Sequence, residues 1–102
     1  MITWPLFAEQ FYNEKLVIQI LKIGVPVGAR KWSTSASSAE IVERDKIERA
    51  VREVMVGDEA NEMADRAKKL KDMAWEAVRE GGSSWSDLTA LLEELRSYRH
   101  QE

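Results

Sequence analysis

The chain opens with MITWPLFAEQFYNEK (residues 1–15), and the rest of the sequence is interpreted outward from this stretch. A short apolar run leads to Pro5, which cannot donate a hydrogen bond to a strand ladder and therefore predicts the end of a strand. A helical pattern begins at Phe7. An acid and an amide, Glu9 and Gln10, thus stand side by side at a predicted strand-to-helix junction.

Two interpretations of this junction stay open on spacing alone. An acid at a helix N-terminus gains about 0.3–1 kcal/mol from the helix dipole, so Glu9 could simply start the helix. Ligands of α/β proteins, however, sit at the carboxyl ends of strands, next to helix N-termini. A carboxylate can accept hydrogen bonds from two hydroxyls, and an amide can both donate and accept. Glu9 and Gln10 therefore also suit a polyhydroxylated ligand.

Composition bounds the possible classes of protein. The chain has 102 residues, 44% hydrophobic and 32% charged, with a net charge of −3 and no cysteine. These values are typical of one soluble globular domain and exclude a disulfide scaffold. No basic face favours nucleic acid, and no apolar run reaches the roughly 20 residues of a membrane span. Without a signal-peptide pattern, a cytoplasmic location is expected.

The N-terminal part predicts a strand–helix–strand piece. Residues 1–4 form the end of a strand, and residues 7–22 form a helix that is apolar nearly all round and therefore buried. Gly24 is expected to stop this helix, and residues 25–27 form a short extended segment. Residues 28–38, GARKWSTSASS, have the composition of a loop.

Three further helices are predicted over residues 44–56, 59–80 and 85–98. Their expected inward faces comprise Ile47, Val51, Val54 and Met55; then Ala60, Met63, Ala67, Leu70, Ala74, Ala77 and Val78; then Leu88, Leu91, Leu92 and Leu95. Ser84 and Asp87 resemble a capping box for the last helix. Four i,i+4 pairs with the acid first predict wet, ion-paired helix faces: Asp45–Arg49, Glu48–Arg52, Glu62–Arg66 and Asp65–Lys69.

Few residues could carry catalysis. His100, the one histidine, lies two residues from the end and is expected to be solvated. No Ser-His-Asp set, phosphate loop or metal-ligand spacing is present, so no catalytic residue and no metal site are predicted in this segment. Among the tryptophans, Trp75 and Trp85 are expected to pack, Trp32 lies in a loop, and Trp4 with Pro5 could shape the Glu9–Gln10 turn.

The stretch WPLFAEQFYNEK resembles the end of the signature box of plant family 1 UDP-dependent glycosyltransferases, in which Pro is followed a few residues later by Asp or Glu and then Gln. The resemblance continues through LVIQILKIGVPVGARKW and RAKKLKDMAWEAVREGGSS. It implies an α/β fold of the GT-B type, with two Rossmann-like domains. This chain would be the mostly helical C-terminal part of the nucleotide-sugar domain, with one or two short strands.

The resemblance also divides the segment and assigns its roles. Residues 1–28 would carry the donor-sugar site, residues 29–43 a loop, and residues 44–102 three closing helices, the last of which would cross to the N-terminal domain. Glu9 and Gln10 would hold the hydroxyls of the donor sugar, and Gln in the final position is associated with glucose over galactose.

The implied reaction transfers glucose from UDP-glucose to a small hydrophobic acceptor such as a triterpenoid, steroid or flavonoid, with no cofactor. The catalytic His and Asp of the family belong to the half that this segment lacks. The chain is therefore expected to be inactive alone and to associate with that remainder or with itself. The alternative is a non-catalytic, mostly helical interaction or structural module.

Overall fold

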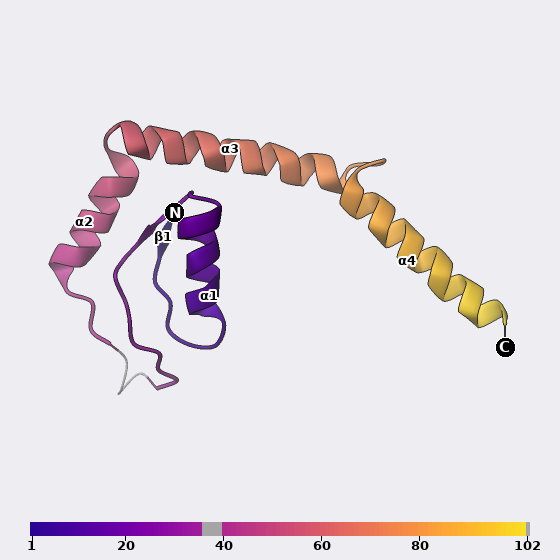
Figure 1. Cartoon of the computed structure of the whole chain (residues 1–102), viewed down its shortest axis with the longest axis horizontal. Coiled ribbons are helices and arrows are strands. Elements are labelled where there is room, and N and C mark those ends of the chain that lie inside the picture. Colours follow the sequence, from indigo (N-terminus) through magenta and orange to yellow (C-terminus); the bar gives the residue numbers. More distant parts are fainter. Residues whose placement is uncertain (36–39, 102) are drawn as a thin grey trace. The chain divides into compact units, whose positions relative to one another are not determined.

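The structure is a computed structural model, and it describes residues 1–35 and 40–101. Two compact units make up the chain, Met1–Ala67 and Lys68–Glu102. The predicted strand–helix–strand piece lies in the first unit, and helical structure fills the second (Figure 1). The predicted α/β character with short strands is therefore confirmed for the described residues.

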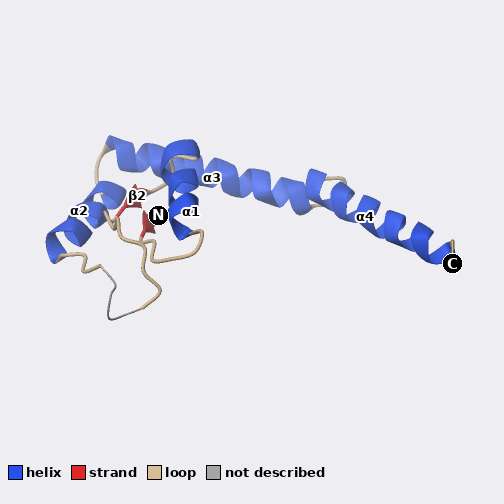
Figure 2. Ribbon diagram, turned by 60° about the horizontal axis from the view of Figure 1, so that its bottom comes forward, coloured by secondary structure: helices blue, strands red, loops and turns tan. Residues whose placement is uncertain are grey.

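The centre of the first unit is a pair of parallel strands, β1 (Ile2–Thr3) and β2 (Val25–Pro26). They are connected through α1 (Gln10–Lys15) and the π-helix η1 (Leu16–Ile20). Helix α1 lies on one side of the strands, and α2 (Arg44–Met55) packs against them on the other (Figures 1 and 2). The turn formed by residues 4–9 joins the carboxyl end of β1 to the start of α1.

Pro26 is accommodated in β2 because the residues on either side of it, Val25 and Val27, make the hydrogen bonds between the strands. The N–H groups of Val25 and Val27 donate to the carbonyls of Met1 and Thr3, both at 2.9 Å. The missing N–H of Pro26 therefore breaks no bond in this register. Val27 is almost completely buried, and the other buried apolar side chains are small: Pro5, Val25, Ala29, Ala50 and Ala60.

The predicted helix over residues 7–22 is shorter and less regular than expected. It begins at Gln10 rather than Phe7, because Ala8 adopts a left-handed backbone with φ 54° that interrupts a helical turn. After Lys15 the bonding widens to i→i−5, as shown by the 2.8 Å bond from Leu21 N to Leu16 O. Its burial is also only partial, since Ile20 is 70% exposed.

Gly24 does not terminate this helix, contrary to the prediction. Lys22 takes the left-handed position with φ 54°, and Arg66 Nε donates to its carbonyl at 2.7 Å. Gly24 is buried instead, and a Cβ there would lie 2.8 Å from both Met1 O and Val17 Cγ1. The absence of a Cβ lets the chain before β2 lie close to the Met1 carbonyl and to Val17 of η1.

Helix α2 has nearly the predicted bounds but a different inward face. Ala50 is fully buried, and Ile47 and Val54 are half-buried, which is the i, i+3, i+7 spacing of a face packed on the strands. Val51 and Met55, expected to face inward, are exposed. A small residue at the centre of the face lets the helix approach the strands closely.

Helices α3 (Asp58–Val78) and α4 (Ser83–His100) confirm the predicted helical segments but not their burial. In α3 only Ala60 is buried, and Met63, Leu70 and Ala77 are half-buried, whereas Val78 and Trp75 are exposed. All four leucines of α4 are 45–57% exposed, and Trp85 is 48% exposed. The described part of the second unit has no second layer that could cover them.

The predicted capping box at Ser84 is wrong. Helix α4 starts at Ser83 with Gly82 as its N-cap, and no side-chain cap hydrogen bond is made there. Gly81 has a φ of 85°, and a Cβ on Gly82 would clash with the Glu76 carbonyl oxygen. The double glycine therefore sets the break between α3 and α4, as its position predicted.

Two of the predicted ion pairs are present, Glu48–Arg52 at 3.1 Å and Glu62–Arg66 at 3.9 Å. Arg49 pairs with Glu53 at 2.9 Å rather than with Asp45. These side chains are largely exposed, so each pair is worth about 0–1 kcal/mol. The predicted loop holds over residues 28–35, and residues 36–38 lie outside the described part. Across residues 1–35 and 40–101, no helix is long and apolar enough to cross a bilayer.

Candidate functional site

The turn between β1 and α1 carries the predicted site residues. Pro5 is buried and follows β1 after Trp4. The chain then reverses so that Gln10 N donates to Phe7 O at 3.2 Å. Ala8, in its left-handed conformation, makes this reversal and sets the direction in which the next residue leaves. Strained non-glycine residues persist only where surrounding contacts hold them, and they concentrate at binding sites.

Gln10 supplies the contacts that hold this turn. Its Oε1 accepts hydrogen bonds from the backbone N–H groups of Leu6, at 2.7 Å, and Phe7, at 3.3 Å. Two N–H donors can be accepted only by the carbonyl end of the amide, which fixes the orientation of the side chain. Its Nε2 group donates to none of the described residues, so Gln10 presents a donor to whatever lies beyond it.

Glu9 occupies the N-cap position of α1, yet its side chain makes no cap hydrogen bond. The residue is exposed. The helix-start interpretation therefore lacks the specific bond that an N-cap carboxylate would make to the first turn, although proximity to the helix dipole remains. Its carboxylate oxygens are available as acceptors, and Glu9 directly precedes Gln10 in the sequence.

An open hollow of about 240 Å³ adjoins the turn and gathers three of the four predicted residues, Trp4, Pro5 and Gln10. Glu9 does not line it. Thr3, Asn13 and Glu14 do, together with Met1 and Val17. Thr3 Oγ1 donates to Glu14 Oε2 at 2.6 Å in a partly buried setting. The sequence analysis did not single out Thr3 or Glu14. The i,i+4 spacing of Gln10 and Glu14 could have indicated that these two residues share one helix face.

The loop after β2 reaches the same turn. Ser33 N donates to Leu6 O at 2.9 Å. Farther along, the Glu40 carboxylate accepts hydrogen bonds from the backbone N–H groups of Arg30, at 2.6 Å, and Lys31, at 2.9 Å. These two bonds, Arg30 first, lower the pKa of Glu40. The loop is thus fastened at one end to the site turn and at the other to Glu40.

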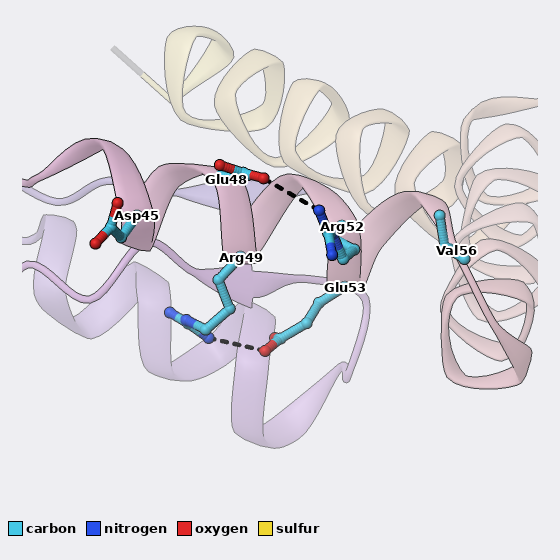
Figure 3. Close-up of a pocket in the computed structure, with 6 residues that line it drawn as sticks. All are labelled: Asp45, Glu48, Arg49, Arg52, Glu53 and Val56. Carbon is cyan, nitrogen blue, oxygen red and sulfur yellow. Dashed lines mark hydrogen bonds and ion pairs between the residues drawn. The ribbon is translucent and has the colours of Figure 1, made fainter.

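A larger hollow, of about 590 Å³, runs along α2, away from this turn. Figure 3 shows the carboxylates of Glu48 and Glu53 directed at Arg52 and Arg49, with which they pair. Arg49 also donates to Pro26 O at 3.3 Å. Four of the hollow's five charged side chains pair with one another, Asp45 makes no ion pair within the described residues, and all five are exposed. This surface therefore has the properties of a solvated helix face. No three His, Asp or Glu within the described ranges could share a metal ion.

Comparison with known proteins identifies the family. No family model matches the chain. Anthocyanin 3'-O-beta-glucosyltransferase from Gentiana triflora is 56% identical over 100 residues, covering 98% of this chain and 21% of that protein. Scopoletin glucosyltransferase from Nicotiana tabacum is 52% identical over 98 residues, covering 96% of this chain and 20% of that protein.

A solved structure supports the same family. The crystal structure of Glycyrrhiza uralensis UGT73P12, complexed with glycyrrhetinic acid 3-O-monoglucuronide, matches with a TM-score of 0.93 at 46% identity, over 98% of this chain and 21% of that one. The chain spans about a fifth of the length of the curated relatives it matches. Over that span, the chain belongs to the plant family 1 UDP-dependent glycosyltransferases and has part of their GT-B fold.

Proposed function

We propose that this chain forms part of a UDP-dependent glucosyltransferase and that Glu9 and Gln10 bind the donor sugar. The reaction would transfer glucose from UDP-glucose to a small hydrophobic acceptor such as a triterpenoid, steroid or flavonoid. The names of the glucosyltransferase relatives support a glucose donor. In this proposal, residues 1–28 carry the donor-sugar contacts, residues 29–43 form a loop, and residues 44–102 supply closing helices in a cytoplasmic enzyme.

One observation carries the sugar-binding role: the two neighbouring side chains offer opposite hydrogen-bonding polarity. Gln10 has its carbonyl engaged by the turn and so offers Nε2 as a donor. Glu9 makes no cap bond and offers carboxylate acceptors. Sugar hydroxyls both donate and accept, so one hydroxyl can donate to Glu9 while another accepts from Gln10. A helix start alone would not need this pair.

Binding of this kind would contribute to catalysis through orientation. Transfer proceeds by in-line attack of the acceptor oxygen on the anomeric carbon, with UDP leaving from the opposite side. Holding the sugar hydroxyls fixes the direction of that carbon, and misplacement by about 1 Å can cost roughly 100-fold in rate. Gln rather than His at position 10 is the choice expected for glucose.

The proposed activity requires the remaining part of the transferase. The chain spans about a fifth of the length of its relatives, and its one histidine, His100, is the last residue of α4. We propose that the exposed leucines of α4 and the exposed residues Leu16 and Ile20 of η1 pack on the rest of the enzyme. The acceptor would be bound mainly by that part.

The test places the segment in a full-length enzyme. Residues 1–102 replace the matching segment of the Gentiana triflora protein, and Glu9→Ala and Gln10→Ala are compared with the unsubstituted chimera. Each variant is expected to lower kcat/KM for UDP-glucose by about tenfold or more, because a hydrogen bond to a charged or desolvated group is lost. Gln19→Ala and Glu93→Ala, both on exposed positions, serve as matched controls.

The alternative function, a non-catalytic helical module, has one observation in its favour, the exposed leucine stripe of α4. It predicts that Glu9→Ala and Gln10→Ala transfer glucose as well as the controls do. That result, with all proteins folded, would refute the proposed donor-sugar role.

A further inference from the structure

We propose that Glu14 is a positioning residue of the donor-sugar site and acts through its hydrogen bond to Thr3. Thr3 is the last residue of β1, directly before Trp4. Glu14 lies one helical turn after Gln10 on α1. The 2.6 Å bond between Thr3 Oγ1 and Glu14 Oε2 therefore joins the strand end to the helix that carries Gln10.

The setting makes this a strong hydrogen bond. A hydroxyl donating to a carboxylate gives a short, charge-assisted bond, about twice as strong as one between neutral groups. Both partners are half-buried, so water competes less for them than at an exposed surface. Removing one partner would leave a partly buried carboxylate without its donor, which costs more than the bond itself contributes.

The bond completes a closed set of contacts around the turn. At its beginning, Gln10 Oε1 holds the N–H groups of Leu6 and Phe7. One helical turn later on α1, Glu14 holds β1 through Thr3. Thr3, Gln10 and Glu14 line the same hollow. Ala8 has a strained backbone conformation within this turn. Both the Gln10 hydrogen bonds and the Thr3–Glu14 hydrogen bond are therefore needed to keep Gln10 in place.

This inference rests on the proposed donor-sugar role of Gln10. If the tie to Thr3 is lost, α1 can shift relative to β1, and the Gln10 donor moves with it. The expected defect is therefore one of orientation: slower transfer and weaker discrimination among sugars that differ in a single hydroxyl, rather than loss of the fold. A merely structural bond would lower stability and leave that discrimination unchanged.

The experiment uses the full-length chimera with Thr3→Val, Glu14→Ala, Glu14→Gln and the double variant Thr3→Val/Glu14→Ala. Thr3→Val and Glu14→Ala are each expected to reduce kcat/KM for UDP-glucose about tenfold and to narrow the preference for UDP-glucose over UDP-galactose. The double variant should be no worse than either single variant, because both remove one bond. Glu14→Gln retains an acceptor oxygen and should restore both readouts to within about threefold of the unsubstituted chimera.

Thr89→Val is the matched control, because the Thr89 hydroxyl also makes one bond, to Trp85 O at 2.9 Å, but on α4. Additive effects of Thr3→Val and Glu14→Ala, or a lowered melting temperature with the sugar preference intact, would overturn the inference. If Glu14→Ala fails to fold, Thr3→Val decides, since it removes only the hydroxyl. If Gln10→Ala impairs transfer and Thr3→Val does not, the positioning role of Glu14 is wrong and the donor-sugar role of Gln10 stands. If neither variant impairs transfer, both roles are wrong.

Discussion

At the scale of single residues, the orientation of Gln10 makes a prediction that simple truncation cannot test. Gln10→Glu keeps an oxygen for the N–H groups of Leu6 and Phe7 but replaces the Nε2 donor with a second acceptor. We expect it to melt near the unsubstituted chimera yet to raise KM for UDP-glucose about tenfold or more. Gln10→Met, which has similar size but no amide, should lose both stability and binding.

The comparison of these two variants separates the two roles of the Gln10 side chain, which are to hold the turn through Oε1 and to bind the sugar through Nε2. Wild-type kinetics in Gln10→Glu would mean that the amide presents its carbonyl, not its amino group, to the sugar. Melting temperature measured by calorimetry and initial rates at varied UDP-glucose concentrations supply both readouts.

The sequence predicts which residues stand at the strand-to-helix turn, but it does not predict their hydrogen-bonding roles. The order strand, proline, acid, amide placed Glu9 and Gln10 at a junction where ligands bind. The amide was expected to donate or accept as needed; the structure commits it to donating, because Ala8 turns two backbone N–H groups toward Oε1. Thr3 and Glu14 were missed because their contact joins a strand and a helix whose packing the sequence does not specify.

At the scale of elements, Gly24 is predicted to be essential for the close packing of the chain before β2 against Met1 and against η1. Gly24→Ala would place a Cβ 2.8 Å from both Met1 O and Val17 Cγ1, so one element must move. We expect a loss of about 1–3 kcal/mol, seen as a lower melting temperature, and a higher KM for UDP-glucose because β1 carries the site turn. Gly57→Ala meets no atom within 4 Å and strains only the backbone, so it should lower stability while leaving KM unchanged. An unchanged melting temperature in Gly24→Ala would contradict this packing.

The loop that reaches the site turn is predicted to loosen only in acid. The N–H groups of Arg30 and Lys31 lower the pKa of Glu40 below its ordinary value of 4.5. A carboxyl with a depressed folded-state pKa stabilises the fold fully above its unfolded value, and that stabilisation is lost as pH falls through the folded value. The amide resonances of Arg30 and Lys31 should therefore titrate with a midpoint below 4.5, and Glu40→Gln should abolish the titration. A titration midpoint at or above 4.5 would contradict the hydrogen bonds from the Arg30 and Lys31 N–H groups to Glu40.

Helix existence was predictable from apolar period and glycine position, whereas helix burial was not. Residues 44–56, 59–80 and 85–98 agree with α2, α3 and α4 to within about two residues. The predicted helix stop at Gly24 and the predicted cap at Ser84 were wrong because both rested on local sequence signals alone. In the structure, Lys22 takes the left-handed position after the first helix, and Gly82 is the N-cap of the last one. The leucines of α4 were expected to face inward because their spacing forms a stripe, but a stripe specifies a face and not what covers it.

At the scale of the whole molecule, exposed apolar surface implies a partner. The stripe Trp85, Leu88, Leu91, Leu92 and Leu95 follows helical spacing, and each side chain is about half exposed. Stable monomers rarely leave contiguous apolar patches of this kind in water. The chain spans about a fifth of the length of its relatives. Under the proposed function, the rest of the transferase is the partner that would cover this surface.

The isolated chain should therefore associate, and it should do so through α4. Analytical ultracentrifugation of the chain alone is expected to show concentration-dependent oligomers, which convert to a one-to-one complex when the remainder of the enzyme is added. Leu88→Lys should weaken both assemblies, because burying a lysine in an apolar interface leaves its charge unpaired. Glu93→Lys changes charge on the opposite face of the same helix and should leave both intact. A dilute-solution monomer with sharp, cooperative thermal unfolding, equally unaffected by the two substitutions, would show that the stripe needs no cover.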